Sequence, residues 1–456
     1  MTAFAWTAKL VTEALALPPA AWDHAYRGLS TDTRTMHDGD LFVALKGERF
    51  DAHDYLGDAR LAGVGGVIVR HDTPRWPGFD WFEVDDTLVA LGRLARLRRE
   101  RFTGPVIAIT GTNGKTSTKE LIAAALGANH TVHRSEKNFN NLVGVPLTVL
   151  AAPLEANAMV VECGTSVRGE IARMREIVRP DIGAITNVDA GHVEGFGSVE
   201  AILEEKIRLL VDVPVAVVGT RPAHLKEAAR RAAKRVVTAA IEGPADWSAE
   251  QVTMLPDGRA RFRVRGVEIE LSLYGRHMVA NALVALAVAD AAGVGLEDAA
   301  RGMAQARIPG GRSEIVEMDG VTVINDCYNA NPASLRAVLD LLVSVRGARR
   351  AVVVIGTMRE LGAQSEALHR EAARAVLAVG PDAVAAVGEF APAFASLGDE
   401  VGTTAMVGAE TAEAVAPLLR DLVRPGDIVL LKASRGVGLE RVIPILWPDR
   451  QAEGPH

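Results

Sequence analysis

The segment G-T-N-G-K-T at residues 111–116 combines two glycines, a lysine and a threonine in the manner of a phosphate-binding loop. A turn of this kind before a helix directs backbone N–H groups and the positive end of the helix dipole toward an anion. Lys115 would supply a mobile cation for phosphate oxygens, and the Thr116 hydroxyl would bind Mg²⁺. The general form G-x-x-x-x-G-K-[ST] has a glycine where this chain has Ile109, so an ordinary tight turn is the alternative.

Three further residues have the chemistry to complete a metal site beside this loop. Glu162 ends the apolar stretch MVVE, and His192 lies in a loop that follows another apolar stretch. The carboxyl ends of parallel strands meet at the ligand crevice of a doubly wound sheet, so both side chains are expected near the metal. Glu162 would otherwise cap the next helix, and a lone histidine is usually structural. Lys206 lies in VEAILEEKIRLL, where sequence alone favours a solvated helix lysine.

The elements that must position these residues alternate between strands and helices. Continuous β-branched runs are typical of a parallel sheet covered on both faces. The predicted strands of this kind are PVIAIT, AMVVECG and DIGAITNV, with a helix at STKELIAAALG. A second series follows near the C-terminus and predicts another doubly wound sheet: VTVIND, ASLRAVLDLLVSV, AVVVIG, DAVAAVG and DIVLLK.

Two short segments that contain Gly and Pro divide the chain into three predicted α/β domains. We expect a small N-terminal α/β domain at residues 1–102, a central α/β domain with the phosphate loop at 103–309, and a C-terminal Rossmann-like domain at 310–456. Within the second, the alternating pattern at residues 259–275 predicts an antiparallel hairpin or meander. The arginine-rich run ALGRLARLRRERF before the first boundary is interpreted as a solvated helix face.

Composition narrows the class of protein. The net charge is −7, which disfavours a nucleic-acid binder held by phosphate contacts. The only two cysteines lack C-x-x-C spacing, so no disulfide framework or zinc site is implied, and a reduced, cytoplasmic setting fits. The longest apolar run has about eight residues, against roughly 20 needed to span a bilayer. We therefore expect no membrane insertion and no nucleic-acid partner.

Taken together, these motifs resemble the Mur ligase family, and the resemblance extends over nearly the whole chain. It is carried by GTNGKT, the Glu162 strand, the His192 loop and Lys206. Further motifs are KNFNNLVGVPLTVL, AGHVEGFGS, DCYNANPAS, GTMRELGAQSEALH and LLKASRGVGLE. These are most similar to the branch that adds D-alanyl-D-alanine to UDP-N-acetylmuramoyl-tripeptide in cytoplasmic peptidoglycan precursor synthesis.

The resemblance implies a two-step ATP-dependent amide ligation with catalytic Lys115, Glu162, His192 and Lys206. A substrate carboxylate takes the γ-phosphoryl group of ATP, and an amine then displaces phosphate from the acyl phosphate. Both steps gather negative charge, so positioning and cations should dominate catalysis. Two Mg²⁺ ions are implied, one held by Thr116 and Glu162, the other by His192 and a carbamylated Lys206. Carbamylation would turn a cation into an anionic oxygen ligand.

The remaining contacts are also implied by the resemblance, and for each a turn residue, helix cap or surface charge is the alternative. The ATP contacts are Gly111, Thr112, Asn113, Gly114, Lys115, Thr116, Asn281, Arg312 and Asp326. The UDP-sugar contacts are Ser30, Asp32, Arg34 and Lys46, with Asn138, Asn140 and Asn141. The amine region is Tyr328, Asn329, Asn331, Lys432, Ser434 and Arg435.

Two other functions stay open at the level of sequence. One is a Mur-like ligase with a different acceptor, such as the single amino acid of a MurE-type enzyme. The other is a P-loop ATPase used as a switch or binding module. The chain departs from the family pattern at residues 163–168 and at Thr357, which bears on the peptide and amine. We expect a monomer with small-molecule partners: the UDP-tripeptide, D-alanyl-D-alanine and ATP.

Overall fold

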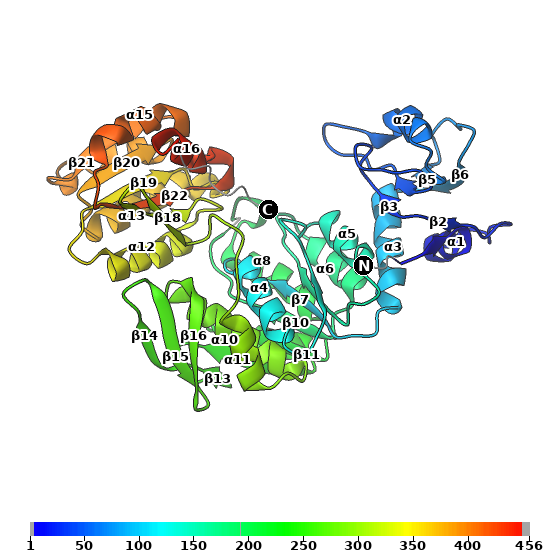
Figure 1. Cartoon of the computed structure of the whole chain (residues 1–456), viewed down its shortest axis with the longest axis horizontal. Coiled ribbons are helices and arrows are strands. Elements are labelled where there is room, and N and C mark those ends of the chain that lie inside the picture. The colour runs from blue at the N-terminus through cyan, green and yellow to red at the C-terminus, as the bar shows by residue number, and fades with distance from the viewer. Residues whose placement is uncertain (1–3, 192, 449–456) are drawn as a thin grey trace.

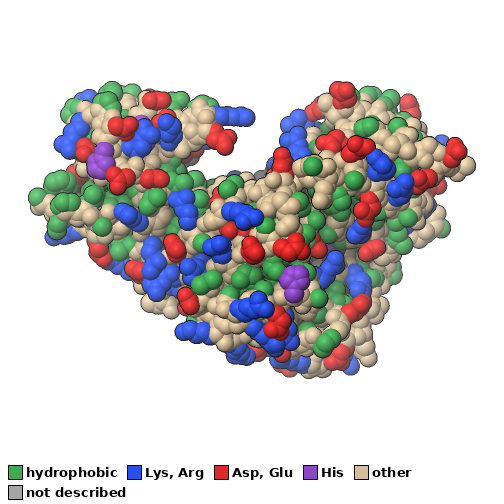
Figure 2. Space-filling view, turned by 180° about the vertical axis from the view of Figure 1, so that it is seen from behind, with side chains coloured by type: hydrophobic (Ala, Val, Ile, Leu, Met, Phe, Trp, Pro, Cys, Tyr) green, Lys and Arg blue, Asp and Glu red, His purple; other side chains and the backbone are tan. Residues whose placement is uncertain are grey.

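The computed structural model describes residues 4–191 and 193–448. The chain forms three α/β units, each built on its own parallel or mostly parallel sheet, with the central unit between the other two (Figure 1). Seen as a solid surface from behind, the N-terminal and C-terminal units stand apart above the central unit, with a wide opening between them (Figure 2). No helix in the described ranges is both long and apolar enough to cross a membrane.

The central unit is a seven-stranded parallel sheet in the order β13-β12-β11-β10-β7-β9-β8. Its strands are β7 Val106–Thr110, β8 Val132–Arg134, β9 Ala158–Glu162, β10 Ile182–Ile185, β11 Val215–Val218, β12 Arg235–Ala240 and β13 Trp247–Ser248. Its helices are α4 Lys115–Leu126, α5 Gly144–Leu150, α6 Glu170–Val178, α7 Val193–Phe196, α8 Val199–Ile207, α9 Leu225–Ala232, α10 His277–Ala291 and α11 Leu296–Met303. The predicted strand–loop–helix series is confirmed.

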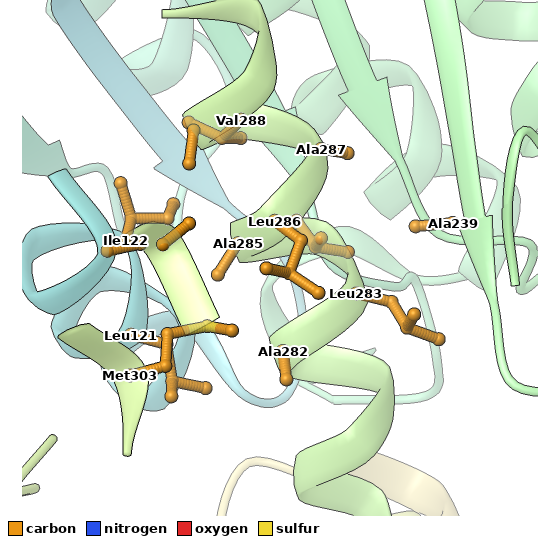
Figure 3. Packing of buried hydrophobic residues seen from close by; sticks show 14 of the residues in the cluster. Leu121, Ile122, Ala239, Ala282, Leu283, Ala285, Leu286, Ala287, Val288 and Met303 are labelled. Carbon is orange, nitrogen blue, oxygen red and sulfur yellow. The ribbon is translucent and has the colours of Figure 1, made fainter. Parts of the chain in front are cut away.

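Strand β7 is fully buried because helices cover both faces of the sheet. Ile107 and Ile109 point into one core, shared with α4, α10 and α11, while Val106 and Ala108 point into another, shared with α5 and α6. This alternation is the period of two expected of a strand. Figure 3 shows the first core, where the apolar helix α10 packs against α4. The end of β7, from which the phosphate loop emerges, is thus held from both sides.

A small antiparallel sheet is attached to the central unit, as the alternating pattern predicts. It runs in the order β14-β15-β16, with bounds β14 Glu250–Met254, β15 Arg259–Val264 and β16 Val267–Tyr274. Its inward residues Phe262, Ile269 and Leu271 join the core of α10. The turn before β15 approaches the C-terminal unit: a Cβ on Gly258 would lie 2.6 Å from Val345 Cγ1.

The N-terminal unit has a four-stranded parallel sheet, β3-β4-β5-β6, and the antiparallel pair β1-β2. Its elements are β1 Trp6–Thr7, α1 Ala8–Leu15, β2 Ala25–Tyr26, β3 Leu29–Ser30, β4 Leu41–Val43, α2 Leu56–Leu61, β5 Gly66–Arg70, β6 Asp80–Val84 and α3 Thr87–Glu100. Leu91 and Leu94 of α3 lie in its core. Ala95 lies in a core of the central unit, so α3 joins the two.

The interpretation of the arginine-rich run as a solvated helix face is wrong. Arg98 is only 2% exposed; its Nη2 donates to Ala152 O at 2.9 Å, and its guanidinium lies over the rings of Phe4 and Phe102. Arg99 Nε donates to Val178 O at 2.8 Å. These arginines bind α3 to carbonyl groups of the central unit, a use that helix periodicity does not reveal.

The C-terminal unit is a six-stranded sheet in the order β17-β18-β22-β19-β20-β21, parallel except for the pair β17–β18. Its strands are β17 Glu314–Met318, β18 Val321–Asp326, β19 Ala351–Gly356, β20 Ala383–Val387, β21 Ala405–Ala409 and β22 Ile428–Lys432. Its helices are α12 Pro332–Arg346, α13 Ser365–Ala378, α14 Phe390–Ala395, α15 Ala412–Leu422 and α16 Val442–Leu446. Two buried clusters flank the sheet. The predicted doubly wound, mostly parallel unit is confirmed.

Candidate active site

The phosphate loop joins the end of β7 to the start of α4 and depends on both of its glycines. Gly111 and Gly114 have φ values of 151° and 77°, which L side chains rarely adopt. A Cβ on Gly111 would lie 1.9 Å from Thr186 Oγ1, and one on Gly114 would lie 2.4 Å from Asn281 Oδ1. The loop is therefore shaped by Thr186, which follows β10, and by Asn281 of α10, as well as by its own sequence.

Lys115 folds back over this loop. Its Nζ donates to Gly111 O at 3.0 Å and to Thr112 O at 3.1 Å. Desolvation lowers the pKa of Lys115, Glu162 opposes this, and Arg312 adds to it. Among the described residues, the hydrogen-bond acceptors of this ammonium group are two neutral carbonyls, so an arriving phosphate offers it a stronger, charged acceptor.

Glu162 is the last residue of β9, and its two carboxylate oxygens differ in their hydrogen bonding. Oε1 accepts a hydrogen bond from Asn140 Nδ2 at 2.9 Å. Oε2 is buried and has no hydrogen-bond partner among the described residues. The helix-cap alternative for Glu162 is wrong, because Glu205 accepts from Gly169 N and Ile171 N at the start of α6. An unpaired anionic oxygen close to Lys115 suits a hard divalent cation.

Lys206 of α8 reaches the same loop. It is 2% exposed, and its Nζ donates to Gly111 O at 3.0 Å, the carbonyl that also accepts from Lys115. Burial, then the charge of Lys115, hold the pKa of Lys206 well below its usual range. The solvated-lysine interpretation is therefore wrong. His192, the other predicted ligand of the second metal, lies outside the described residues; these hold no group of three or more His, Cys, Asp or Glu arranged for a metal.

Two residues of the C-terminal unit reach the phosphate loop. Arg312 Nη2 donates to Thr116 Oγ1 at 3.2 Å, and its guanidinium lies 3.5 Å from the centre of the Tyr328 ring. Asn331 Nδ2 donates to Asn113 Oδ1 at 2.7 Å. The structure thus brings the predicted ATP residue Arg312 to the loop. Asn331, predicted for the amine, also lies at the loop.

Known protein families and curated proteins match most of this chain. The family described as "Mur ligase middle domain" matches residues 109–289, and "Mur ligase, glutamate ligase domain" matches residues 311–435. A Bacillus subtilis protein named UDP-N-acetylmuramoyl-tripeptide–D-alanyl-D-alanine ligase is 34% identical over 442 residues, covering 91% of this chain and 92% of the relative. The Escherichia coli protein of that name is 33% identical over 444 residues, with coverage of 92% and 93%.

Solved structures give the same assignment. MurF from Acinetobacter baumannii superposes with a TM-score of 0.88 at 31% identity, covering 98% of this chain and 100% of that one. MurF ligase from Thermotoga maritima in complex with ADP gives 0.80 at 27% identity, with coverage of 93% and 97%. The chain belongs to the MurF family of Mur ligases. Its three-domain α/β architecture is that of the family.

The other predicted amine residues of this MurF-family chain are mostly held by their own unit. Lys432 is 1% exposed, and its Nζ donates to Asp326 Oδ2 at 2.6 Å and to Asn329 O at 2.7 Å. Ser434 Oγ donates to Ala330 O at 3.3 Å. Arg435 is exposed, with its guanidinium 5.8 Å from the Tyr328 ring centre. Of the two charged residues in this set, Arg435 is thus the exposed one, and its Nη1 lies 3.6 Å from Glu440 Oε1.

Two more predicted ATP residues are already engaged inside the protein. Asp326 accepts from Ser313 N at 2.7 Å as well as from Lys432. Asn281 is buried against Gly114, and its Nδ2 lies 3.6 Å from Met278 Sδ. Their roles toward ATP stay predictions.

The predicted UDP-sugar residues lie in two groups. On the N-terminal unit, Asp32 accepts a forked pair from Arg34 at 2.9 and 2.6 Å, which lowers the pKa of Asp32 to about 2. Ser30 Oγ donates to Asp32 O at 3.0 Å, while Lys46 is exposed and lies 3.7 Å from Asp51. The other group is in the loop before α5.

In that loop, the three predicted asparagines differ in their surroundings. Asn141 Oδ1 accepts from Val143 N and Gly144 N and so opens α5, which is the turn alternative. Asn138 is exposed. Asn140 holds Glu162 as described above. Of the three, Asn140 is therefore the one tied to the candidate metal ligand.

Sequence reasoning missed the polar residues after β10 that fix the loop from the side. Thr186 Oγ1 donates to Asn113 O at 2.6 Å, and Asn187 Oδ1 accepts from Asn113 N at 3.0 Å. Thr112 Oγ1 donates to Asp189 O at 3.2 Å. The available signal was their position: T-N-V-D follows a predicted strand next to the loop strand, where ligand-site residues gather.

Proposed function

We propose that this chain is an ATP-dependent ligase that joins D-alanyl-D-alanine to UDP-N-acetylmuramoyl-tripeptide. Its curated relatives carry that name, and a solved relative binds ADP. The observation that carries the proposal is that Glu162 Oε2, which is buried without a hydrogen-bond partner among the described residues, and Arg312 both lie at a glycine-rich loop. This set of groups is suited to a polyphosphate and its cation.

In the proposed reaction the loop and the start of α4 bind the β- and γ-phosphates. Lys115 leaves the carbonyls of Gly111 and Thr112 for phosphate oxygens, and Arg312 turns from Thr116 toward the same charge. When bound, Mg²⁺ would be held by Thr116 and Glu162 and would supply positive charge against the phosphates. The chain's own contribution is alignment: the glycines fix the loop, and Asn140 fixes Glu162.

The bonds change in two steps. The tripeptide carboxylate attacks the γ-phosphorus of ATP, the bond to the β-phosphate oxygen breaks, and ADP leaves. The amine of the dipeptide then attacks the acyl phosphate; inorganic phosphate leaves and a proton is released from nitrogen. Water must be kept from the acyl phosphate, so we expect the opening between the outer units to narrow when substrates bind (Figure 2).

We also propose that Lys206 is carbamylated and, with His192, holds a second Mg²⁺. A buried lysine with a depressed pKa has the neutral amine that adds to CO₂, giving a carbamate and a proton. The proposal includes a cytoplasmic monomer with domains at residues 1–102, 103–309 and 310–456.

The test is phosphate release from ATP and Mg²⁺ with UDP-N-acetylmuramoyl-tripeptide, with and without D-alanyl-D-alanine, together with the mass of the product. Release that needs both substrates and yields the pentapeptide is the expected result. Activity with a single amino acid in place of the dipeptide would change the acceptor to a MurE-type one. Turnover that ignores both substrates would replace the ligase by an ATPase switch.

A further inference from the structure

A fully buried lysine lies one helical turn beyond the phosphate-loop lysine. Lys119 of α4 is 0% exposed, and its Nζ donates to Ser135 O at 2.6 Å. The same Nζ lies 2.9 Å from Glu120 Oε1. Glu120 in turn accepts from Arg134 Nε at 2.7 Å. Neither Lys119 nor Ser135 has a part in the reaction proposed above.

Burying a lysine charge is costly, even when it is paired, and an apolar residue of similar size often serves stability as well. The Lys119–Glu120 pair is therefore weak evidence for a purely stabilising role. Instead, the hydrogen bond from Lys119 to the carbonyl of Ser135 holds the backbone of Ser135 in place. Ser135 is the residue after β8, next to the end of β9.

Ser135 connects this lysine to Glu162. Its Oγ accepts from Glu162 N at 3.0 Å, and its own N donates to Val160 O at 3.0 Å. Thr148 Oγ1 also lies 3.4 Å from Ser135 Oγ. Ser135 is 1% exposed, so no solvent replaces these bonds. A continuous path thus runs from α4 through Ser135 to the backbone of the candidate metal ligand.

The two ends of this path are the two candidate ligands of one cation. Thr116 begins α4, and Lys119 lies three residues later on the same rigid helix. Glu162 ends β9, where Asn140 holds only one of its oxygens. A cation binds tightly only when both ligands are held at a fixed separation. The path from Lys119 through Ser135 to Glu162 would therefore set the affinity of the site for the cation.

We propose that Lys119 is a positioning residue that, through Ser135, sets Glu162 against Thr116 for the nucleotide-bound divalent cation. This rests on the proposed function, because it takes the cation at Thr116 and Glu162 as given. The rival explanation is that Lys119 serves only its ion pair with Glu120. The two differ in which neighbour of Lys119 matters for metal binding.

The experiment measures binding of a fluorescent, nonhydrolysable ATP analogue to the full chain, in Mg²⁺ and in EDTA. The ratio of the two dissociation constants gives the gain in affinity due to the cation. In Lys119→Met and in Ser135→Ala we expect this gain to fall by about 10-fold, the lower end of the effect of losing a residue that orients a metal ligand. The dissociation constants in EDTA should stay close to wild type.

Glu120→Gln is the matched control, because it breaks the buried ion pair and leaves Ser135 untouched. We expect it to lower the thermal midpoint while keeping the cation-dependent gain. Ser135→Ala keeps the carbonyl that Lys119 binds, so it tests the link from Ser135 to Glu162 even where Lys119→Met fails to fold. A wild-type gain in either Lys119→Met or Ser135→Ala overturns the proposal.

The wild-type protein separates this inference from the proposed function. A wild-type chain whose nucleotide affinity ignores Mg²⁺ would remove the cation site and both proposals with it. A wild-type gain that the variants preserve would remove only the role of Lys119 and Ser135.

Discussion

Arg312 Nη2 and Thr116 Oγ1 lie 3.2 Å apart although 196 positions separate them in the chain. The contact joins the segment before β17 to the start of α4, and it occupies the hydroxyl that we assign to Mg²⁺. The stacking of the same guanidinium on Tyr328 holds its plane near the loop. Arg312 is therefore placed to exchange a hydroxyl for a phosphate oxygen when nucleotide enters.

Replacing Arg312 by lysine should lower kcat/KM for ATP while leaving the fold intact. Lysine keeps the charge but cannot both stack on Tyr328 and donate in a fixed plane. We expect a loss of about 10-fold or more, the equivalent of one charge-assisted hydrogen bond of about 1.5–3 kcal/mol. Steady-state kinetics with ATP varied measures it. Arg307→Gln, an exposed arginine of the same linker, is the control and should retain wild-type kinetics.

Asn331 caps a helix and also contacts the phosphate loop, and substitutions can separate these two roles. Its Oδ1 caps α12 through Ser334 N, and its Nδ2 donates to Asn113. Asn331→Ser keeps a capping oxygen but is too short to reach the loop. We expect it to raise the KM for ATP about fivefold, the value of one hydrogen bond of about 1 kcal/mol, with little change in stability. Asn331→Ala should add about 1 kcal/mol of lost stability from the missing cap. An equal KM for ATP in wild type and Asn331→Ser would show that the contact to Asn113 does not contribute to ATP binding.

The buried Lys206 should make stability depend on pH in a defined direction. Its folded pKa lies well below the ordinary 10.5, so between these two values the unfolded chain binds more protons than the folded one. The free energy of unfolding then rises with pH across that window. In CO₂-free buffer, Lys206→Met should show a shallower rise than wild type between neutral pH and about pH 10 in urea titrations. Lys115 shifts in the same direction, so part of the slope should remain.

Carbamylation of Lys206 gives an independent signature. Wild-type protein in ¹³C-bicarbonate should show a carbamate carbon signal that Lys206→Met lacks. Lys206→Ala should lose activity and regain part of it with a short-chain carboxylic acid, which supplies the missing oxygen ligand. Full activity of Lys206→Ala without any additive would rule out a role for Lys206 at the metal.

Arg98 should contribute to stability rather than to catalysis. Arg98→Met leaves Ala152 O without its donor and removes the guanidinium from the rings of Phe4 and Phe102. We expect a loss of about 2 kcal/mol in the free energy of unfolding from the orphaned buried carbonyl and the lost ring contacts. Arg93→Met, an exposed position on the same helix, should cost far less, and denaturant melts of both compare them.

The strands and helices of this chain were predictable because their signals are local. The β-branched runs around Ile107 and Val353 specify buried parallel strands wherever they occur. The phosphate loop was predictable for the same reason, since Gly111, Gly114 and Lys115 are close in sequence. The apolar strand pattern placed Glu162 correctly at the end of a strand that neighbours the loop strand.

Contacts that depend on how the units pack were not predictable from local patterns. Lys206 and Arg98 lie on helices where charge normally faces water. Lys206 is buried against the phosphate loop of its own unit, and Arg98 is buried between α3 and the central unit. The hydrogen bond from Asn331 to Asn113 likewise required the placement of one sheet against another. The path from Lys119 through Ser135 to Glu162 could not be predicted, because the sequence T-S-T-K-E is also typical of an ordinary polar first turn of a helix.

The hydrophobic cores have a consequence for how the molecule unfolds. The C-terminal sheet has its own two clusters, and the phosphate loop meets that unit through the polar contacts of Arg312 and Asn331. Because the buried members of both clusters all belong to the C-terminal unit, with Tyr274 of β16 only partly buried against one of them, heating the free protein should melt the C-terminal unit as a separate calorimetric transition. Nucleotide held by both units would favour the state in which they are joined, and should draw the separate transitions together. The separation between the two calorimetric transitions would then measure how strongly the central and C-terminal units both bind one nucleotide.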